Sequence, residues 1–93
     1  MSKHIGSSFD DFLEGEGLLA EAEAVAIKRV IAWQIRKLME EQRLSKAEMA
    51  RRMGTSRSAL ERLLDPENAS VTLLTLERAA KALGKSLRIE LAA

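Results

Sequence analysis

The segment Ser45–Leu64, SKAEMARRMGTSRSALERLL, contains two short helical patterns separated by a single glycine. Two helices that cross closely need a small residue in the first helix, a residue that tolerates positive φ in the turn, and an aliphatic residue in the second helix. Ala50, Gly54 and Leu60 meet these needs in order along the chain, because glycine adopts a positive φ without steric penalty. This spacing predicts a helix-turn-helix.

Start and stop signals define these two helices. Ser45 and Glu48 form an S-x-x-E capping box at the start of the first helix. Thr55 or Ser56 is expected to cap the second helix. The Asp65-Pro66 pair is expected to end it, because the residue before a proline avoids the helical region.

Three further helices are predicted around this pair. Residues 8–14 form a short acidic pattern that Gly15 and Gly17 are expected to end. Residues 18–42 form a long helical pattern, and residues 72–84 run from a threonine cap to a glycine stop. The chain therefore reads as an all-α, five-helix domain.

The long helix has one apolar stripe, and Trp33 lies nearly opposite to it. The stripe consists of Ile27, Val30, Ile31, Ile35 and Leu38. We expect the apolar side of the N-terminal helix, with Phe9 and Phe12, to fold back over Trp33. The alternative is that Trp33, Phe9 and Phe12 form a surface that binds a partner.

The spacing of apolar residues changes at the end of the chain from a helical period to an alternation. Leu87, Ile89 and Leu91 alternate with charged residues, which predicts a single β-strand within residues 84–93. One strand cannot satisfy its own backbone groups. It would have to pair with a second copy of the chain, with another protein, or with the N-terminal arm, so these three residues are candidate dimer or partner contacts.

Charge divides the chain into an acidic arm, residues 1–24, and a basic domain, residues 25–93. The arm has a net charge of −5 and the domain +6, within a chain of +1. A basic body favours an anionic partner. With no cysteine, and with its one histidine, His4, near the chain start, the sequence predicts no metal, no cofactor and no enzymatic activity. No apolar run approaches the ~20 residues of a membrane span, so we expect a cytoplasmic protein with no membrane partner.

The helix pair and the following TLLTLERAAKALG resemble the phage-repressor-like helix-turn-helix domain of Xre-type regulators. Two longer stretches, GSSFDDFLEGEG and TSRSALERLLDPENASVTLLTLERAAKALGKSLRIEL, are similar to HigA-type antitoxins, which are small autorepressors encoded beside an RNA-cleaving toxin. The resemblance implies that the second helix of the pair enters the DNA major groove.

Residues 43–62 contain six Lys or Arg against two Glu, for a net charge of +4. Arg57 and Ser58 lie in the first turn of the second helix, where recognition helices contact bases, and an arginine can donate two hydrogen bonds to a guanine. Glu61 could accept from a cytosine or orient a neighbouring arginine. The full set of candidate DNA-binding residues is Lys46, Thr55, Ser56, Arg57, Ser58, Glu61 and Arg62.

The sequence thus predicts a repressor that binds a pseudo-palindromic operator in double-stranded DNA as a homodimer, and the resemblance implies an antitoxin with a toxin partner. Two alternatives stay open: a repressor without a toxin, and a protein-interaction adaptor on the same fold. The sequence departs from the pattern of this family in the acidic Asp65-Pro66-Glu67 after the recognition helix. This acidity puts phosphate contacts from the loop in doubt.

Overall fold

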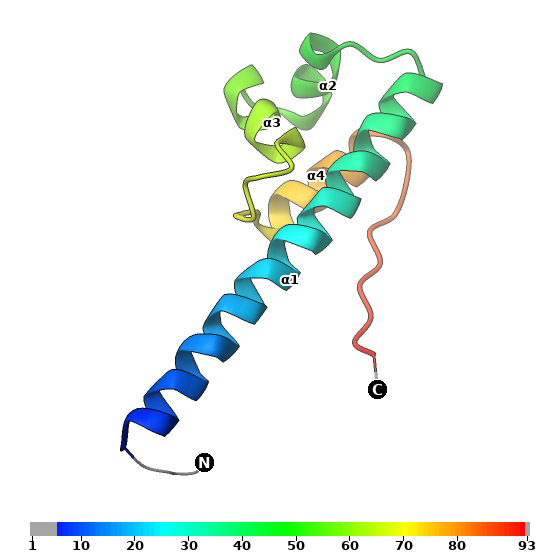
Figure 1. Ribbon diagram of the computed structural model, residues 1–93. Helices are drawn as coiled ribbons and strands as arrows, with labels where there is room; N and C mark the ends of the chain where they lie inside the picture. Colours follow the sequence, from blue (N-terminus) through cyan, green and yellow to red (C-terminus); the bar gives the residue numbers. More distant parts are fainter. Residues whose placement is uncertain (1–5, 93) are drawn as a thin grey trace.

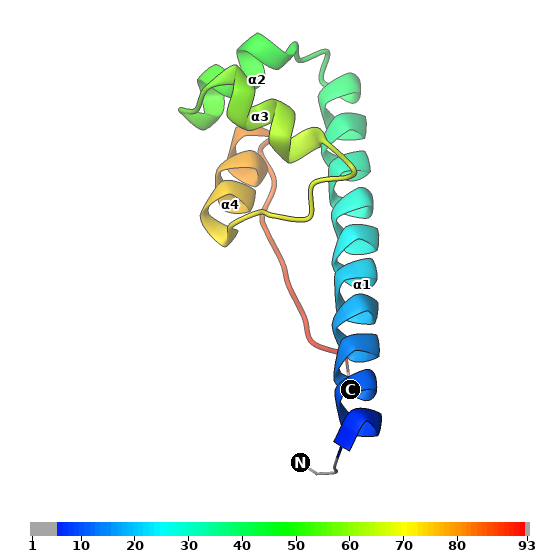
Figure 2. The ribbon, with the colours of Figure 1, turned by 60° about the vertical axis from the view of Figure 1, so that its left-hand side comes forward.

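The computed structural model describes the backbone of residues 6–92 and the side chains of residues 21–92, and the described part contains four helices. Their bounds are α1 Gly6–Glu41, α2 Lys46–Met53, α3 Arg57–Leu64 and α4 Leu73–Ala82. The three short helices gather beside the C-terminal half of α1, while its N-terminal half extends beyond them (Figures 1 and 2). No described helix is both long and apolar enough to cross a membrane.

The prediction of five helices is wrong, because the short acidic helix and the long helix are one continuous helix, α1. Gly15 and Gly17 lie inside it. A glycine costs a helix only about 1 kcal/mol relative to alanine. The surrounding Leu, Ala and Glu residues favour helix, and no proline interrupts them. Two glycines alone therefore do not end the helix.

The core lies between the C-terminal half of α1 and the three short helices. α1 contributes Ala32, Ile35 and Met39, whereas Ile27 and Val30, both predicted to face inward, are 60% and 54% exposed. The buried side of α1 is therefore rotated from the predicted stripe. The other helices and the residue after α4 supply the remaining buried apolar side chains: Met49, Ala50, Met53, Leu60, Leu63, Leu64, Leu76, Ala79 and Leu83.

The helix-turn-helix prediction is confirmed in its local details. The Ser45 hydroxyl accepts a hydrogen bond from the Glu48 N–H, and Ser56, rather than Thr55, caps α3. Gly54 ends α2 in the left-handed conformation, with φ at 69°. Leu60 has no exposed surface and shares one core cluster with Ala50, so the seam between the two helices is closed.

The predicted C-terminal strand is wrong: residues 85–92 form no β-ladder, and the described residues contain no strand. The segment instead runs away from the end of α4 without regular structure (Figure 1). Leu87 is half-buried against the core, whereas Ile89 is 59% and Leu91 97% exposed. A single extended segment cannot form a ladder where the described chain offers no second strand.

The prediction that an N-terminal helix folds back over Trp33 is also wrong. α1 runs straight through this region, and Trp33 is 60% exposed. The Lys37 ammonium lies 5.5 Å from the centre of the indole ring, within range of a cation–π interaction. Phe9 and Phe12 belong to α1, but their side chains lie outside the described residues.

Candidate nucleic-acid interface

Helix α3 has one buried side and one open side. Leu60, Leu63 and Leu64 hold the buried side in the core. The open side carries all four α3 residues that the sequence nominates for base contact, and each is exposed: Arg57, Ser58, Glu61 and Arg62. The α3 backbone is therefore anchored while these four side chains remain accessible to a ligand.

The start of α3 combines two hydroxyl groups with a helix N-terminus. Ser56 is exposed, and its hydroxyl oxygen accepts a hydrogen bond from the Ala59 N–H at 3.1 Å. Thr55 is half-buried beside it. The first N–H groups of a helix lack intrahelical partners and favour anions. These residues therefore suit a phosphate better than a base edge.

Glu61 lies between two cationic side chains from different helices. Its carboxylate is 3.6 Å from Lys46 Nζ and 3.5 Å from Arg57 Nε. All three side chains are at least one-third exposed, so these pairs contribute little to stability. They do hold Lys46 and Arg57 near each other, and this geometry favours an orienting role for Glu61 over direct readout of cytosine.

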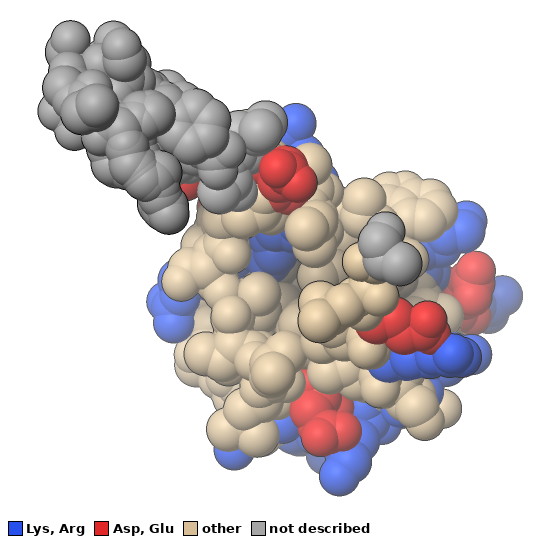
Figure 3. Space-filling model, turned by 90° about the horizontal axis from the view of Figure 1, so that it is seen from below, with Lys and Arg blue, Asp and Glu red and all other residues tan. Residues whose placement is uncertain are grey.

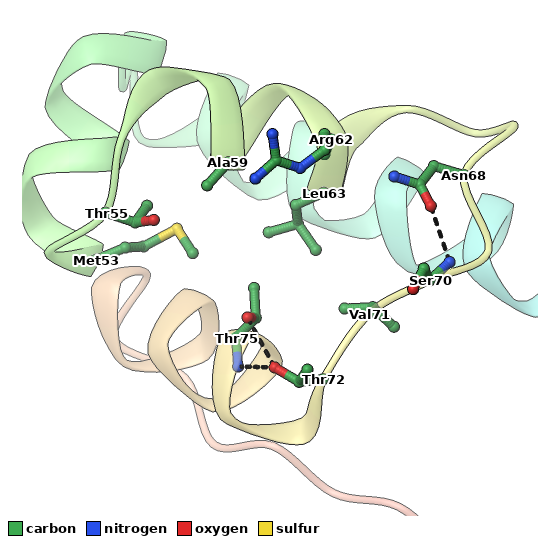
Figure 4. A pocket seen from close by; sticks show the side chains of 10 residues that line it. All are labelled: Met53, Thr55, Ala59, Arg62, Leu63, Asn68, Ser70, Val71, Thr72 and Thr75. Carbon is green, nitrogen blue, oxygen red and sulfur yellow. Dashed lines mark hydrogen bonds between the residues drawn. The ribbon is translucent and has the colours of Figure 1, made fainter.

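A hollow of about 280 Å³ opens beside α3 (Figure 4). It lies between α3, the loop after it and the start of α4, and Arg62 and Thr55 contribute to its wall. Thr72 and Thr75 line the α4 side, and their hydroxyl oxygens are 2.9 Å apart. The hollow thus extends the polar surface of α3 onto α4, which the sequence reasoning missed.

Cations on α1 hold the C-terminal end of α3 and the loop that follows it. Lys28 Nζ donates to the carbonyl oxygens of Arg62, Asp65 and Asn68 at 3.1, 3.2 and 2.7 Å. Arg36 donates to the Leu64 carbonyl at 3.0 Å. The sequence reasoning missed both residues. The one available signal for Lys28 is its position four residues before Ala32 and seven before Ile35, on the same side of the helix.

Two acidic residues of the loop after α3 and of α2 are paired with arginines. Glu67 lies in the acidic loop after α3, and its carboxylate is 2.7 Å from the Arg29 guanidinium. On α2, hydrogen bonds from Arg51 and Arg52 hold the pKa of Glu48 below its ordinary value. The Ser45 hydroxyl accepts from the Glu48 N–H, but the Glu48 carboxylate binds Arg51 and Arg52 and not the Ser45 N–H, so the predicted reciprocal half of the capping box is wrong.

These features define a helix-turn-helix DNA-binding domain: a glycine turn in the left-handed conformation, a buried seam, and a second helix with exposed cations. The family model of the Cro/C1-type HTH DNA-binding domain matches residues 34–87, more than half of the chain. The chain belongs to this family, as the Xre-type resemblance implies. No curated protein and no solved structure gives a significant match. The family match makes the chain a DNA-binding regulator.

Proposed function

We propose that the chain is a sequence-specific transcriptional repressor that reads DNA bases through α3. The observation that carries this proposal is the exposure of Arg57 and Ser58 in the first turn of a helix whose opposite side is buried. The Arg57 side chain is 63% exposed. It can therefore reach a guanine edge while Leu60 keeps the α3 backbone fixed.

The other candidate residues have supporting roles in this proposal. Arg62 reads a second base or a phosphate from the last turn of α3. Thr55, Ser56 and Lys46 contact the phosphate backbone, which fixes the register of the protein on DNA without reading sequence. Glu61 orients Arg57 and Lys46.

We propose further that two copies bind a pseudo-palindromic operator together. Apolar side chains exposed on the single chain support a contact between copies, and three of them are Trp33, Ile89 and Leu91. Uncharged surface occupies the centre of the end of the molecule seen in Figure 3, and many of the charged side chains lie towards its edge. Leu87, which lies beside Ile89 and Leu91 in sequence, extends this candidate contact; Phe9 and Phe12 are further candidates from the N-terminal half of α1.

Selection of binding sites from random DNA duplexes tests the repressor proposal. We expect two similar half-sites about one helical turn, ~34 Å, apart. Titration of the selected duplex with protein should give a binding constant whose logarithm falls with log[salt] by about 0.9 for each phosphate contacted. A protein-interaction adaptor would show neither a selected sequence nor this salt dependence, and that result would refute the proposal.

The variant Leu91→Lys tests the proposed dimer contact. It places a charge in the proposed contact without touching α3. We expect it to bind a single half-site like the original chain but to lose tight binding to the full operator. If it still binds the full operator with two chains at unchanged affinity, the C-terminal segment is not the dimer contact.

A second function, that of an antitoxin, is favoured by the acidic part of α1. Six acidic residues lie on α1 before residue 34, where the family match begins, and this part of α1 extends away from the short helices (Figure 2). They are Asp10, Asp11, Glu14, Glu16, Glu21 and Glu23. A basic, RNA-cleaving toxin encoded by the adjacent reading frame is the partner that this charge would attract.

Neutralising these six residues with Asn and Gln tests the antitoxin proposal on the full chain. We expect the variant to bind its operator normally and to lose co-purification with the adjacent gene product. The control replaces Glu40, Glu41 and Glu77 with Gln, which removes acidic side chains outside residues 10–23. If the six-residue variant still captures the neighbouring protein, or if no such protein is captured by the original chain, the repressor has no toxin partner of this kind.

A further inference from the structure

Lys28 is a buried cation whose hydrogen bonds are all to the main chain of distant residues. It is 2% exposed, although lysine is rarely buried without partners. Its Nζ donates to three carbonyl oxygens, those of Arg62, Asp65 and Asn68. An ammonium group has three donors, so the Lys28 head group is fully satisfied.

The carbonyls that Lys28 binds belong to the end of α3 and the loop after it. The last carbonyls of a helix lack intrahelical partners, and a cation at this end interacts favourably with the helix dipole. Arg36 donates to the Leu64 carbonyl in the same region. Two cations from α1 therefore add donors at the end of α3: Arg36 binds the Leu64 carbonyl, and Lys28 binds the Arg62 carbonyl, which also accepts from the Asp65 N–H. Burial lowers the pKa of Lys28, while the negative charge of Asp65 acts in the opposite direction.

The two ends of α3 are held by different parts of the chain. Its N-terminal end follows the Gly54 turn from α2, and its C-terminal end is attached to α1 through Lys28 and Arg36. α3 has eight residues, which is a length of about 12 Å. Loss of the attachment at one end of so short a helix would let it tilt, and the side chains of its open face would move with it.

Lys28 lies outside the part of the chain that matches the family, which begins at residue 34. The attachment through Lys28 therefore comes from the part of α1 before the matched residues, whereas the attachment through Arg36 comes from within them. Lys28 cannot itself contact DNA, because its ammonium is buried against main-chain oxygens.

We propose that Lys28 is a positioning residue for DNA recognition, which fixes the C-terminal end of α3 on α1 and so sets the direction in which α3 presents Arg57 and Arg62. This inference rests on the proposed role of α3 as the recognition helix. It adds that the orientation of α3 depends on a residue outside the part of the chain that matches the family, residues 34–87.

The test compares Lys28→Met with Arg29→Met. Methionine has a similar length to lysine and favours helix, but it has no donor for the three carbonyls. Arg29 is the neighbouring cation, and it is bound to the same loop through an exposed pair with Glu67. Both variants lose one positive charge from the same turn of α1, so a difference between them reports the buried hydrogen bonds.

Two measurements are made at a temperature where circular dichroism shows both variants fully folded. Without DNA, we expect Lys28→Met to shift the backbone amide resonances of residues 57–68 more than those of α2. With DNA, we expect its affinity for the selected operator to fall by about tenfold or more, since small misplacements of contact groups are costly. Its affinity for random duplex should change by less than about twofold. Binding to random DNA depends on phosphate contacts, which carry no sequence information. Arg29→Met should leave the preference for the operator unchanged.

The variant Lys28→Gln covers the case in which Lys28→Met does not fold. Its amide still donates hydrogen bonds but is shorter and uncharged, and the same loss of operator preference is expected in weaker form. Equal loss of affinity for operator and random DNA, or unchanged α3 resonances in a folded variant, would overturn the inference. If Arg57→Ala lowers operator affinity while the Lys28 variants do not, the recognition helix stands and only the positioning role fails.

Discussion

Replacing Leu60 with alanine is expected to lower the free energy of unfolding by about 2–5 kcal/mol. Leu60 has no exposed surface and lies in the seam between α2 and α3, in one cluster with Met49 and Met53. Truncation would leave a cavity between two short helices. Small domains have only about 5–15 kcal/mol of stability in total, so this loss is a large share. Urea unfolding followed by circular dichroism measures it.

The matched control is Leu73→Ala, the same substitution at the first residue of α4. Leu73 is 65% exposed, and we expect a change within about 0.5 kcal/mol. Comparable losses for the two variants would mean that Leu60 does not fill the seam, and that the helix pair is held in some other way.

Replacing Arg57 with alanine is expected to weaken operator binding by about 1–3 kcal/mol and to relax the preference at one base-pair position. The side chain is exposed and its pair with Glu61 is solvated, so thermal unfolding should change little. Fluorescence anisotropy with the selected operator, and with operators altered at each position in turn, measures both effects.

Lys46→Ala separates base reading from phosphate contact. Lys46 faces the same Glu61 carboxylate as Arg57, but it lies at the start of α2. We expect its loss to weaken binding to all sequences alike and to flatten the salt dependence by about 0.9 in log–log slope. If Arg57→Ala behaves in this way too, or changes neither affinity nor preference, α3 does not read bases through Arg57.

The helix-turn-helix could be predicted because its signals are local. A capping serine, a glycine in the left-handed region and a leucine in the seam act within a few residues of one another, and the structure has Ser45, Gly54 and Leu60 in these roles. The exposure of Arg57 follows from the same pattern, since helical periodicity that buries Leu60, Leu63 and Leu64 leaves the opposite side open.

The errors concern features that depend on the rest of the chain. The alternation of Leu87, Ile89 and Leu91 indicates an extended segment, but a strand also needs a partner, and periodicity contains no information about one. The predicted inward side of α1 is wrong because a pattern of apolar residues places every lysine on the outward side, whereas Lys28 is buried. Lys28 is buried because its partners are main-chain carbonyls 34 to 40 residues away, which no local pattern reports.

The unbroken course of α1 also has a mechanical consequence. Thirty-six residues without a joint make a rod of about 54 Å, with its acidic end free of the short helices and the contacts of Lys28 and Arg36 nearer its other end. A force applied to the free end would act with a long moment arm about these contacts. A partner bound to that end would therefore exert torque on α3 through the contacts of Lys28 and Arg36.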